Sequence, residues 1–234
     1  MRLDKYVSDA AVCSRSTAAA MIKAGRVTAD GKTVSKADYK LNEKNAAVTL
    51  DSKPLCYREF IYIMMNKPAG VVSATDDMRE KTVLSLLPEN YASKGLFPVG
   101  RLDKDTVGLL ILTNDGKGAH RMLAPKSHID KTYYVECDSD FAIGDIEICK
   151  KGIMLDGEMT KPCILSINNE KRNCAEMVLT EGKYHEIKRI CKHLGKTVTF
   201  LERINFAGLP LDRALGRGQW RNLTDGEIAL IKKQ

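Results

Sequence analysis

The chain has 234 residues, 44% hydrophobic and 29% charged, which is enough for one large or two modest globular domains with a hydrophobic core. No apolar run approaches the roughly 18 residues of a membrane span, and the first residues, MRLDKYVSDA, lack the apolar segment of a secretory signal, so neither a membrane-spanning nor an exported protein is expected. The formal net charge is +7, and the first 60 residues hold 11 Lys and Arg against 7 Asp and Glu, which suits a nucleic acid or another anionic surface as partner.

Seven cysteines are spread along the chain, and none forms a Cys-x-x-Cys pair. This usage favours a reducing cytoplasm and mostly buried thiols over a disulfide framework. Cys191 and His193 lie near His185, but their spacing matches no zinc site, so no metal is expected. The Gly-Lys-Thr triplet at residues 195–197 is not a phosphate-binding loop, because Ile190 stands where that loop needs its earlier glycine.

The first elements along the chain are two short helices. Residues 2–8 have the apolar spacing of one helical face. A second helix is expected to begin after Ser14 or Ser16, either of which can cap its first turn, and to end at Gly25.

A hairpin follows at residues 26–34, where an Asp30-Gly31 turn is a strong short-range signal. Helices and hairpin together form a first domain of residues 1–50. A linker is expected at residues 51–58, which are of mixed polarity and contain Pro54.

Residues 59–234 form a second domain in which strand-like runs alternate with turns and a few short helices. The strands are expected within residues 59–70, 109–113, 132–137, 164–167, 175–179 and 197–204. A tight turn is expected at residues 114–116. The predicted fold class is α+β, with a mixed, mainly antiparallel sheet flanked by helices in this second domain.

One helix of the second domain, residues 184–194, has a clear amphipathic pattern and ends at Gly195. Its apolar face is formed by Ile187, Ile190, Cys191 and Leu194. The residues expected to point away from that face are His185, Arg189 and Lys192. Lys188 lies on the flank, where its stem packs while its ammonium group reaches a cleft.

Residues 100–116, GRLDKDTVGLLILTNDG, place two carboxylates, Asp103 and Asp105, close together in a chain that is basic overall. A carboxylate that faces a polyanion is repelled unless a cation pairs with it. Lys188 and Arg189 supply a candidate pair of cations, and residues 131–134, KTYY, add an aromatic ring suited to stacking on a displaced base. Asp105 is expected to point to the opposite side of an extended chain and to be structural.

The first domain carries a recognisable pattern of small, apolar and basic residues. The pattern comprises Arg2-Leu3-Asp4, Ser14-Arg15, Ile22, Gly25-Arg26-Val27 and Asp30-Gly31-Lys32. It resembles the S4 domain, a small RNA-binding module of ribosomal and RNA-modifying proteins. The resemblance implies binding of structured RNA through phosphate contacts, which position a protein without reading sequence. The candidate RNA-binding residues here are Arg2, Arg15, Lys23, Arg26 and Lys32.

Six segments carry a second resemblance. They are residues 65–77 (MNKPAGVVSATDD), 100–116, 131–136 (KTYYVE), 181–198 (EGKYHEIKRICKHLGKTV), 200–212 (FLERINFAGLPLD) and 223–231 (LTDGEIALI). Together they resemble the pseudouridine synthases, in the branch that contains ribosomal small subunit pseudouridine synthase A. The resemblance implies that Asp103 is catalytic, that Tyr133 is the active-site aromatic residue and that Lys188 pairs with the carboxylate. Many relatives carry Gln in place of Glu186, and Arg in place of Lys188, so the pair here is a point-charge pair.

That family isomerises uridine in RNA: the glycosidic bond is cut, the uracil turns, and C5 bonds to C1′, with no hydrolysis and no cofactor. Asp103 either attacks C1′ as a nucleophile or removes the C2′ proton to form a glycal, and the sequence does not separate the two. A paired-carboxylate scheme needs a second acid and a water path, for which Asp105 is a poor candidate. Tyr133 is expected to stack on the flipped uracil, and Arg101 to hold its phosphate or fill the space it leaves.

The leading hypothesis is a pseudouridine synthase of small-subunit ribosomal RNA, with ribosomal RNA or an assembly intermediate as partner and a monomer as the default state. A synthase of large-subunit ribosomal RNA is the alternative within the same chemistry. A non-catalytic S4-type binder in ribosome assembly is the alternative from another class, and the complete set of Asp103, Tyr133 and Lys188 argues against it.

Overall fold

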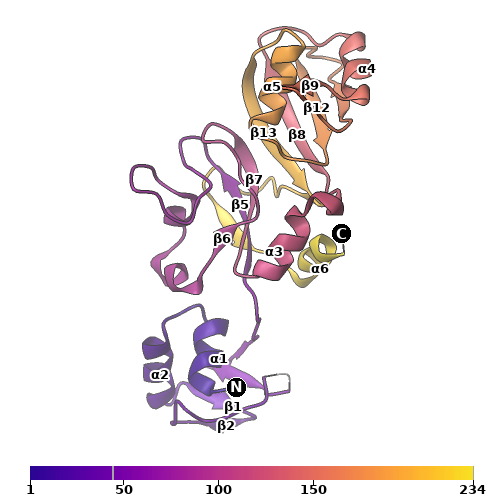
Figure 1. Cartoon of the computed structure of the whole chain (residues 1–234). Helices are drawn as coiled ribbons and strands as arrows, with labels where there is room; N and C mark the ends of the chain where they lie inside the picture. Colours follow the sequence, from indigo (N-terminus) through magenta and orange to yellow (C-terminus); the bar gives the residue numbers. More distant parts are fainter. Residues whose placement is uncertain (44, 234) are drawn as a thin grey trace. The chain divides into compact units, whose positions relative to one another are not determined.

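The computed structural model describes residues 1–43 and 45–233 and divides the chain into two compact units. The first unit comprises Met1–Ile61 together with Leu87–Leu96. The second comprises Tyr62–Leu86 and the chain from Phe97 onward (Figure 1). The first unit therefore includes a segment that lies far from the rest of it in sequence.

Two helices of the first unit pack against its sheet: α1 (Leu3–Ala10) and α2 (Arg15–Lys23). The Ser14 hydroxyl accepts a hydrogen bond from the Thr17 amide at 3.1 Å, which caps α2 as predicted. Gly25 follows the helix with a φ of 72°, a left-handed conformation that favours glycine. The core of the unit contains Leu3, Tyr6, Val7, Ala18, Ile22, Val27 and Val48.

The sheet of the first unit is antiparallel and has the order β2-β1-β3-β4. Its strands are β1 (Val27–Ala29), β2 (Lys32–Thr33), β3 (Val48–Leu50) and β4 (Lys53–Leu55). Asp30 and Gly31 join β1 to β2 with φ values of 50° and 78°, as a two-residue hairpin turn requires, so the predicted hairpin is confirmed. β4 pairs with β3, so residues expected to form a linker complete this sheet instead.

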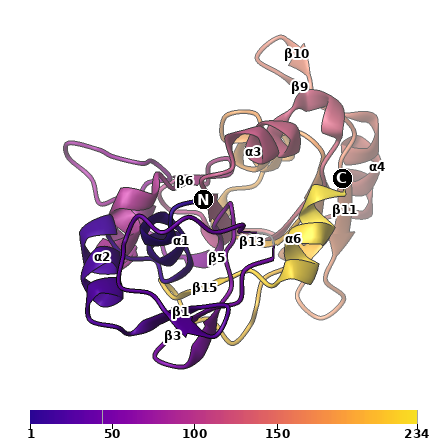
Figure 2. The same ribbon diagram turned by 90° about the horizontal axis from the view of Figure 1, so that it is seen from below.

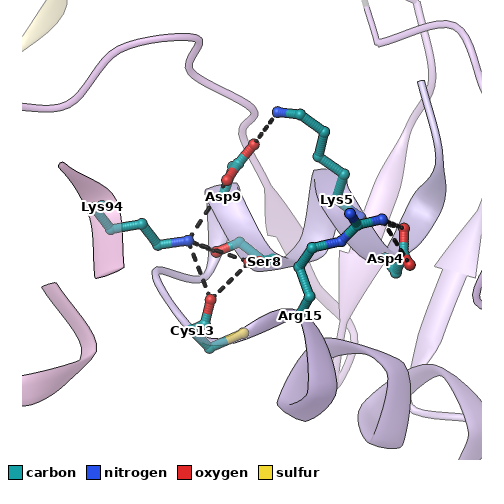
Figure 3. Close-up of polar contacts among 7 residues, drawn as sticks. All are labelled: Asp4, Lys5, Ser8, Asp9, Cys13, Arg15 and Lys94. Carbon is teal, nitrogen blue, oxygen red and sulfur yellow. Dashed lines mark hydrogen bonds and ion pairs between the residues drawn. The ribbon is translucent and has the colours of Figure 1, made fainter. Parts of the chain in front are cut away.

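The segment Leu87–Leu96 packs on the C-terminal end of α1 and contains a 3-10 turn, Glu89–Lys94 (Figure 3). The side chain of Lys94 is only 8% exposed. Its ammonium group donates hydrogen bonds to the carbonyl oxygens of Ser8 at 2.9 Å and Cys13 at 3.1 Å. These contacts tie the segment to the helices of the first unit.

The second unit is built on one sheet with the order β11-β12-β8-β13-β7-β5-β15, with β14 added to β13 and β6 to β7. The strands are β5 (Tyr62–Lys67), β6 (Phe97–Pro98), β7 (Val107–Thr113), β8 (Lys131–Cys137), β11 (Ile164–Ile167), β12 (Cys174–Leu179), β13 (Val198–Phe206), β14 (Leu209–Pro210) and β15 (Trp220–Asn222). β13 and β7 are parallel and the other described pairs are antiparallel, which confirms the predicted sheet. A separate hairpin of β9 (Met154–Leu155) and β10 (Glu158–Met159) lies at the edge of the unit (Figure 2).

The helices of the second unit flank this sheet, as expected for an α+β fold. They are α3 (Gly116–Leu123), α4 (Ile143–Lys151), α5 (Glu186–His193) and α6 (Asp225–Lys232), with 3-10 turns at Val83–Leu86 and Pro125–Ser127. α4 contacts β11, α5 contacts β13, and α3 contacts α6. A core of apolar side chains from β8, β11, β12 and β13 is covered by α4 and α5.

Two predictions about this unit are wrong at element boundaries. The expected tight turn at residues 114–116 is the start of α3, because the Asp115 carboxylate accepts a hydrogen bond from the Gly118 amide at 2.8 Å and caps a helix. α5 begins at Glu186, two residues later than expected, while Ile187 and Ile190 are buried on its predicted apolar face.

β7 and β13 approach each other closely at Gly108, which has a φ of 99°. A Cβ atom at this position would overlap the backbone of Arg203 on β13. Only glycine therefore permits the parallel contact that places the end of the 100–106 segment beside β13.

None of the helices in the described part of the chain combines the length and the apolar character that a bilayer crossing requires. Within residues 1–43 and 45–233, no group of three or more His, Cys, Asp and Glu side chains is arranged to hold a metal ion.

Candidate active site

The carboxylate of Asp103 and the ammonium group of Lys188 form an ion pair within the second unit. Asp103 lies in the irregular segment before β7, and Lys188 lies on α5, which packs on β13. Lys188 Nζ is 3.2 Å from Asp103 Oδ2, and the two side chains are 26% and 29% exposed. The predicted pairing is therefore present in the geometry, in a position that both water and a substrate can reach.

Asp105 shares the same ammonium group, with its Oδ1 accepting a hydrogen bond from Lys188 Nζ at 2.6 Å. The expectation that Asp105 points to the opposite side is wrong, because the Thr106 amide donates to the Asp103 carbonyl at 3.1 Å and the segment turns instead of running extended. Burial lowers the pKa of Lys188, but the hydrogen bonds to Asp105 and Asp103 outweigh it and raise that pKa above its usual value. Lys188 is therefore a permanent cation at neutral pH.

His185 also faces the Asp103 carboxylate, at 3.6 Å between Nε2 and Oδ1. The sequence predicted that this side chain points away. Helical periodicity does not apply to it, because α5 begins one residue later and His185 has a φ of 48°. Its ring stacks on Tyr184 at 3.8 Å between centroids.

A buried lysine donates hydrogen bonds to the backbone of the segment that contains Asp103. Lys67, at the end of β5, is fully buried, and its Nζ donates to the carbonyl oxygens of Asp103 at 2.9 Å and Thr106 at 2.8 Å. The Ser73 hydroxyl accepts from the Leu102 amide at 3.0 Å. Burial lowers the pKa of Lys67 to about 8. The sequence motifs did not single out Lys67, although a lysine that ends a strand of otherwise apolar character was a usable signal.

A pocket at this site is lined by Asp103, His185 and Lys188 and also contains Tyr133. Tyr133 is half-buried on β8, and Arg101 is exposed at the rim. The structure thus brings together Asp103, Tyr133, Lys188 and Arg101, four of the residues predicted from the sequence.

Two buried polar atoms in this pocket have no protein partner within the described residues. They are Thr106 Oγ1 and Glu186 Oε1. Buried polar atoms normally find a partner, so an unpaired one in a pocket points to a ligand or to a proton that it shares.

A proton held between the carboxyl groups of Glu186 and Glu181 accounts for the unpaired Glu186 Oε1. Burial, followed by a hydrogen bond with Glu181, raises the pKa of Glu186 to about 7. Burial also raises the pKa of Glu181, but the hydrogen bonds from Glu186 and the Lys161 amide, together with the charges of Lys183 and Lys161, outweigh it and hold that pKa below its usual value. Below about pH 7 the Glu186 carboxyl is therefore neutral, with a proton to donate to the Glu181 carboxylate.

The predicted RNA-binding residues of the first unit are largely held by acidic partners. Arg2 and Arg15 both donate to the Asp4 carboxylate, at 2.9 and 3.0 Å, and remain about half exposed. Arg26 binds Asp51 through two hydrogen bonds, at 2.9 and 2.6 Å.

Lys23, in the last turn of α2, and Lys32, on β2, are exposed. Together with the half-exposed arginines they offer positive charge to solvent from one small unit.

Comparisons with known proteins agree with the geometry. A family model described as RNA pseudouridylate synthase matches residues 61–193, and a model of the S4 domain matches residues 1–46. The chain belongs to the RNA pseudouridylate synthase family. It is therefore an isomerase that acts on RNA, with an S4 domain in front of the catalytic one.

The similarity to two relatives extends over nearly the full length of this synthase. It is 42% identical to the RNA pseudouridine synthase YtzG of Bacillus subtilis (strain 168), over 100% of this chain and 99% of that protein. It is 39% identical to ribosomal small subunit pseudouridine synthase A of Escherichia coli (strain K12), over 99% and 100%. A solved pseudouridylate synthase is similar with a TM-score of 0.70 at 33% identity, over 99% of both chains. The predicted family, fold and enzyme class are confirmed.

Proposed function

We propose that this synthase converts a specific uridine of small-subunit ribosomal RNA to pseudouridine, with Asp103 as the catalytic residue. The observation that carries the proposal is the Asp103–Lys188 ion pair of 3.2 Å in a pocket that also holds Tyr133. The similarity over nearly its full length to an enzyme named for the small ribosomal subunit supports the substrate.

The reaction exchanges one bond for another. The N1–C1′ bond of the uridine breaks and the C5–C1′ bond forms, while C5 loses a proton and N1 gains one, so no oxidant or hydrolytic water is consumed. Asp103 starts it either by attacking C1′ or by removing the C2′ proton. Both routes need an ionised carboxylate close to the ribose, and the Lys188 ammonium group lies 3.2 Å from the Asp103 carboxylate.

The neighbouring residues bind and orient the substrate in this proposal. A base must leave its stack to reach the pocket, at a cost of a few kcal/mol. Stacking on Tyr133 recovers part of this cost, since a base on an aromatic ring contributes about 1–3 kcal/mol. Asp105 fixes Lys188 through the hydrogen bond of 2.6 Å, so that the ammonium group stays beside Asp103.

The first unit positions the synthase on its RNA. Arg2, Arg15, Lys23, Arg26 and Lys32 supply phosphate contacts in this proposal, and Arg101 contacts the flipped nucleotide at the pocket. The partner is ribosomal RNA or an assembly intermediate that contains it, and the proposal includes a monomeric enzyme in the cytoplasm.

The catalytic assignment is tested by release of tritium from RNA that carries 5-tritiated uridine, because C5 loses its hydrogen in the reaction. We expect Asp103→Asn to abolish release while RNA affinity stays within about twofold, since the side chain keeps its size and only the charge is lost. Release by Asp103→Asn at the wild-type rate would remove Asp103 from the mechanism.

The substrate is tested separately, by mapping pseudouridine in ribosomal RNA incubated with the purified enzyme and in RNA from a strain that lacks the gene. We expect one site, in small-subunit RNA. A site in large-subunit RNA would keep the chemistry and replace the substrate.

A further inference from the structure

A second cavity adjoins the active-site pocket, and the isomerisation at Asp103 gives it no role. It has a volume of about 350 Å³ and shares Arg101, Tyr133 and Glu181 with the pocket of Asp103. Five basic residues line it, against Glu181 as the single acidic lining residue within the described chain. A cavity with this balance of charge suits an anion.

The deepest of these cations is Arg203 on β13, which is 2% exposed. Its Nε donates to the Leu109 carbonyl at 2.7 Å, and its guanidinium lies over the Phe206 ring at 5.1 Å. No group in the described part of the chain accepts a hydrogen bond from its Nη2. A buried guanidinium nitrogen without an acceptor is costly in a folded protein unless a ligand supplies one.

Lys131 on β8 reaches the same cavity. Arg203 lies opposite Tyr133 in the register of β13 and β8, and Lys131 is two residues from Tyr133, so the three side chains share one face of the sheet. Lys131 Nζ donates to the Ile129 carbonyl at 3.0 Å. Burial and then the nearby charge of Arg203 lower the pKa of Lys131. Two cations that repel each other across one cavity are both stabilised when an anion enters.

Three of the other charged groups of the cavity, Lys183, Lys161 and Glu181, are engaged with protein partners, and Arg101 is exposed. Lys183 Nζ pairs with Glu158 at 3.1 Å, and Lys161 Nζ contacts His128 Nδ1 at 3.2 Å. Glu181 accepts from the Lys161 amide at 2.7 Å and interacts with the carboxyl group of Glu186, so its carboxylate is occupied by protein donors. Lys131 and Arg203 are thus the pair of cations placed to bind a ligand.

We propose that this cavity binds a backbone phosphate of the substrate RNA, next to the uridine that occupies the pocket of Asp103, through Lys131 and Arg203. The inference rests on the proposed function. A phosphodiester offers the oxygens that the guanidinium and ammonium groups lack. Tyr133 and Arg101 line both cavities, so a strand whose base occupies one cavity has room to extend into the other. The site therefore anchors the strand beside the flipped base.

The test uses the full-length enzyme and the RNA fragment that contains its mapped uridine. Arg203→Met risks misfolding, so the variant is Lys131→Met, with Lys131→Arg as the rescue and Lys192→Met, at an exposed position of α5, as the matched loss of charge. We expect Lys131→Met to raise KM about tenfold with kcat within about twofold, to reduce the slope of log K against log salt by about 0.7–0.9, and to be rescued by arginine.

The phosphate is identified by RNAs in which one linkage beside the target uridine is an uncharged methylphosphonate. One of these should weaken binding to the wild type about tenfold and leave binding to Lys131→Met unchanged, because the two changes remove the same interaction. Additive effects at every linkage would overturn the proposal. So would competition by inorganic phosphate with indifference to every linkage, which indicates a site for a free anion. Loss of turnover by the wild type on every ribosomal RNA would instead contradict the proposed function.

Discussion

Two carboxyl groups in the active-site pocket have different neighbours. Asp103 faces the ammonium group of Lys188, at 3.2 Å. Glu186 is 6% exposed and faces another carboxyl, Glu181, so its neutral form is favoured and its pKa rises to about 7. Burial first, and then the neighbouring carboxyl, therefore favour the neutral form of Glu186.

At the residue scale we predict that Glu186 makes the stability of the second unit depend on pH. Below its ordinary pKa of 4.5, the Glu186 carboxyl is protonated in both the folded and the unfolded chain. Between pH 4.5 and about 7, only the unfolded chain releases the proton. The free energy of unfolding therefore falls as the pH rises through that window. Glu186→Gln keeps a donor for Glu181 and removes the titration. Its free energy of unfolding relative to the wild type should increase by about 1–3 kcal/mol between pH 5 and pH 8.

Urea unfolding at several pH values measures this difference. Glu176→Gln, at an exposed position on β12, is the matched control and should leave the pH dependence as in the wild type. Parallel curves for Glu186→Gln and the wild type would contradict the shared proton.

At the scale of elements, the short segment Leu87–Leu96 is attached to the C-terminal end of α1 by several polar contacts. Besides the carbonyl oxygens of Ser8 and Cys13, the Lys94 ammonium group is 3.5 Å from the Asp9 carboxylate (Figure 3). The Asn90 side chain donates to the Val12 carbonyl at 2.8 Å. The carbonyl groups at the end of α1 carry partial negative charge, so a cation there stabilises both the helix and the segment.

We predict that Lys94→Met lowers the free energy of unfolding of the first unit by about 2–3 kcal/mol, because it removes several hydrogen bonds from a nearly buried charge. Hydrogen exchange of the amides in α1 should accelerate correspondingly, and those of β8 should not change. Lys150→Met, in an exposed pair with Glu147, should cost less than about 1 kcal/mol. Equal effects of the two substitutions would show that the Lys94 hydrogen bonds do not hold the unit together.

At the scale of the whole molecule, the chain contributes twice to the first unit, through Met1–Ile61 and through Leu87–Leu96. Deletion of residues 1–50 therefore removes the partners of Lys94 as well as the basic residues. A weaker RNA affinity of that truncated protein could come from misfolding or from the loss of basic side chains. Substitution of individual basic residues is therefore the sharper test of the S4 domain.

We predict that replacing Arg15, Lys23 and Lys32 together by Gln weakens RNA binding and lowers the steepness of its salt dependence. Each phosphate that the protein no longer neutralises reduces the slope of log K against log salt by about 0.7–0.9. The kcat at saturating RNA should remain within about twofold, because the pocket of Asp103 is untouched. Binding measured by fluorescence anisotropy across a salt series tests this.

A control variant removes three exposed lysines of the second unit instead, Lys150, Lys151 and Lys171. It has the same net charge as the triple variant of the S4 domain. Equal decreases of affinity in the two variants would mean that overall charge, and not the S4 domain, drives binding.

The sequence determined the parts of this protein that depend on local patterns and on family motifs. The Asp30-Gly31 turn, the cap at Ser14 and the buried face of α5 follow from residue chemistry at short range. The motif around Asp103 and the Lys188 partner followed from resemblance, and the geometry brings the two side chains together.

Only the tertiary structure decided which groups meet across long distances in sequence. Asp105 lies beside Lys188 because the chain turns at Thr106, and His185 faces Asp103 because α5 starts after it. Lys67 and Arg203 are buried, and each donates a hydrogen bond to a backbone carbonyl that is far away in sequence, that of Asp103 and that of Leu109. Periodicity describes one element at a time, so contacts made by irregular segments and by buried polar side chains are beyond its reach.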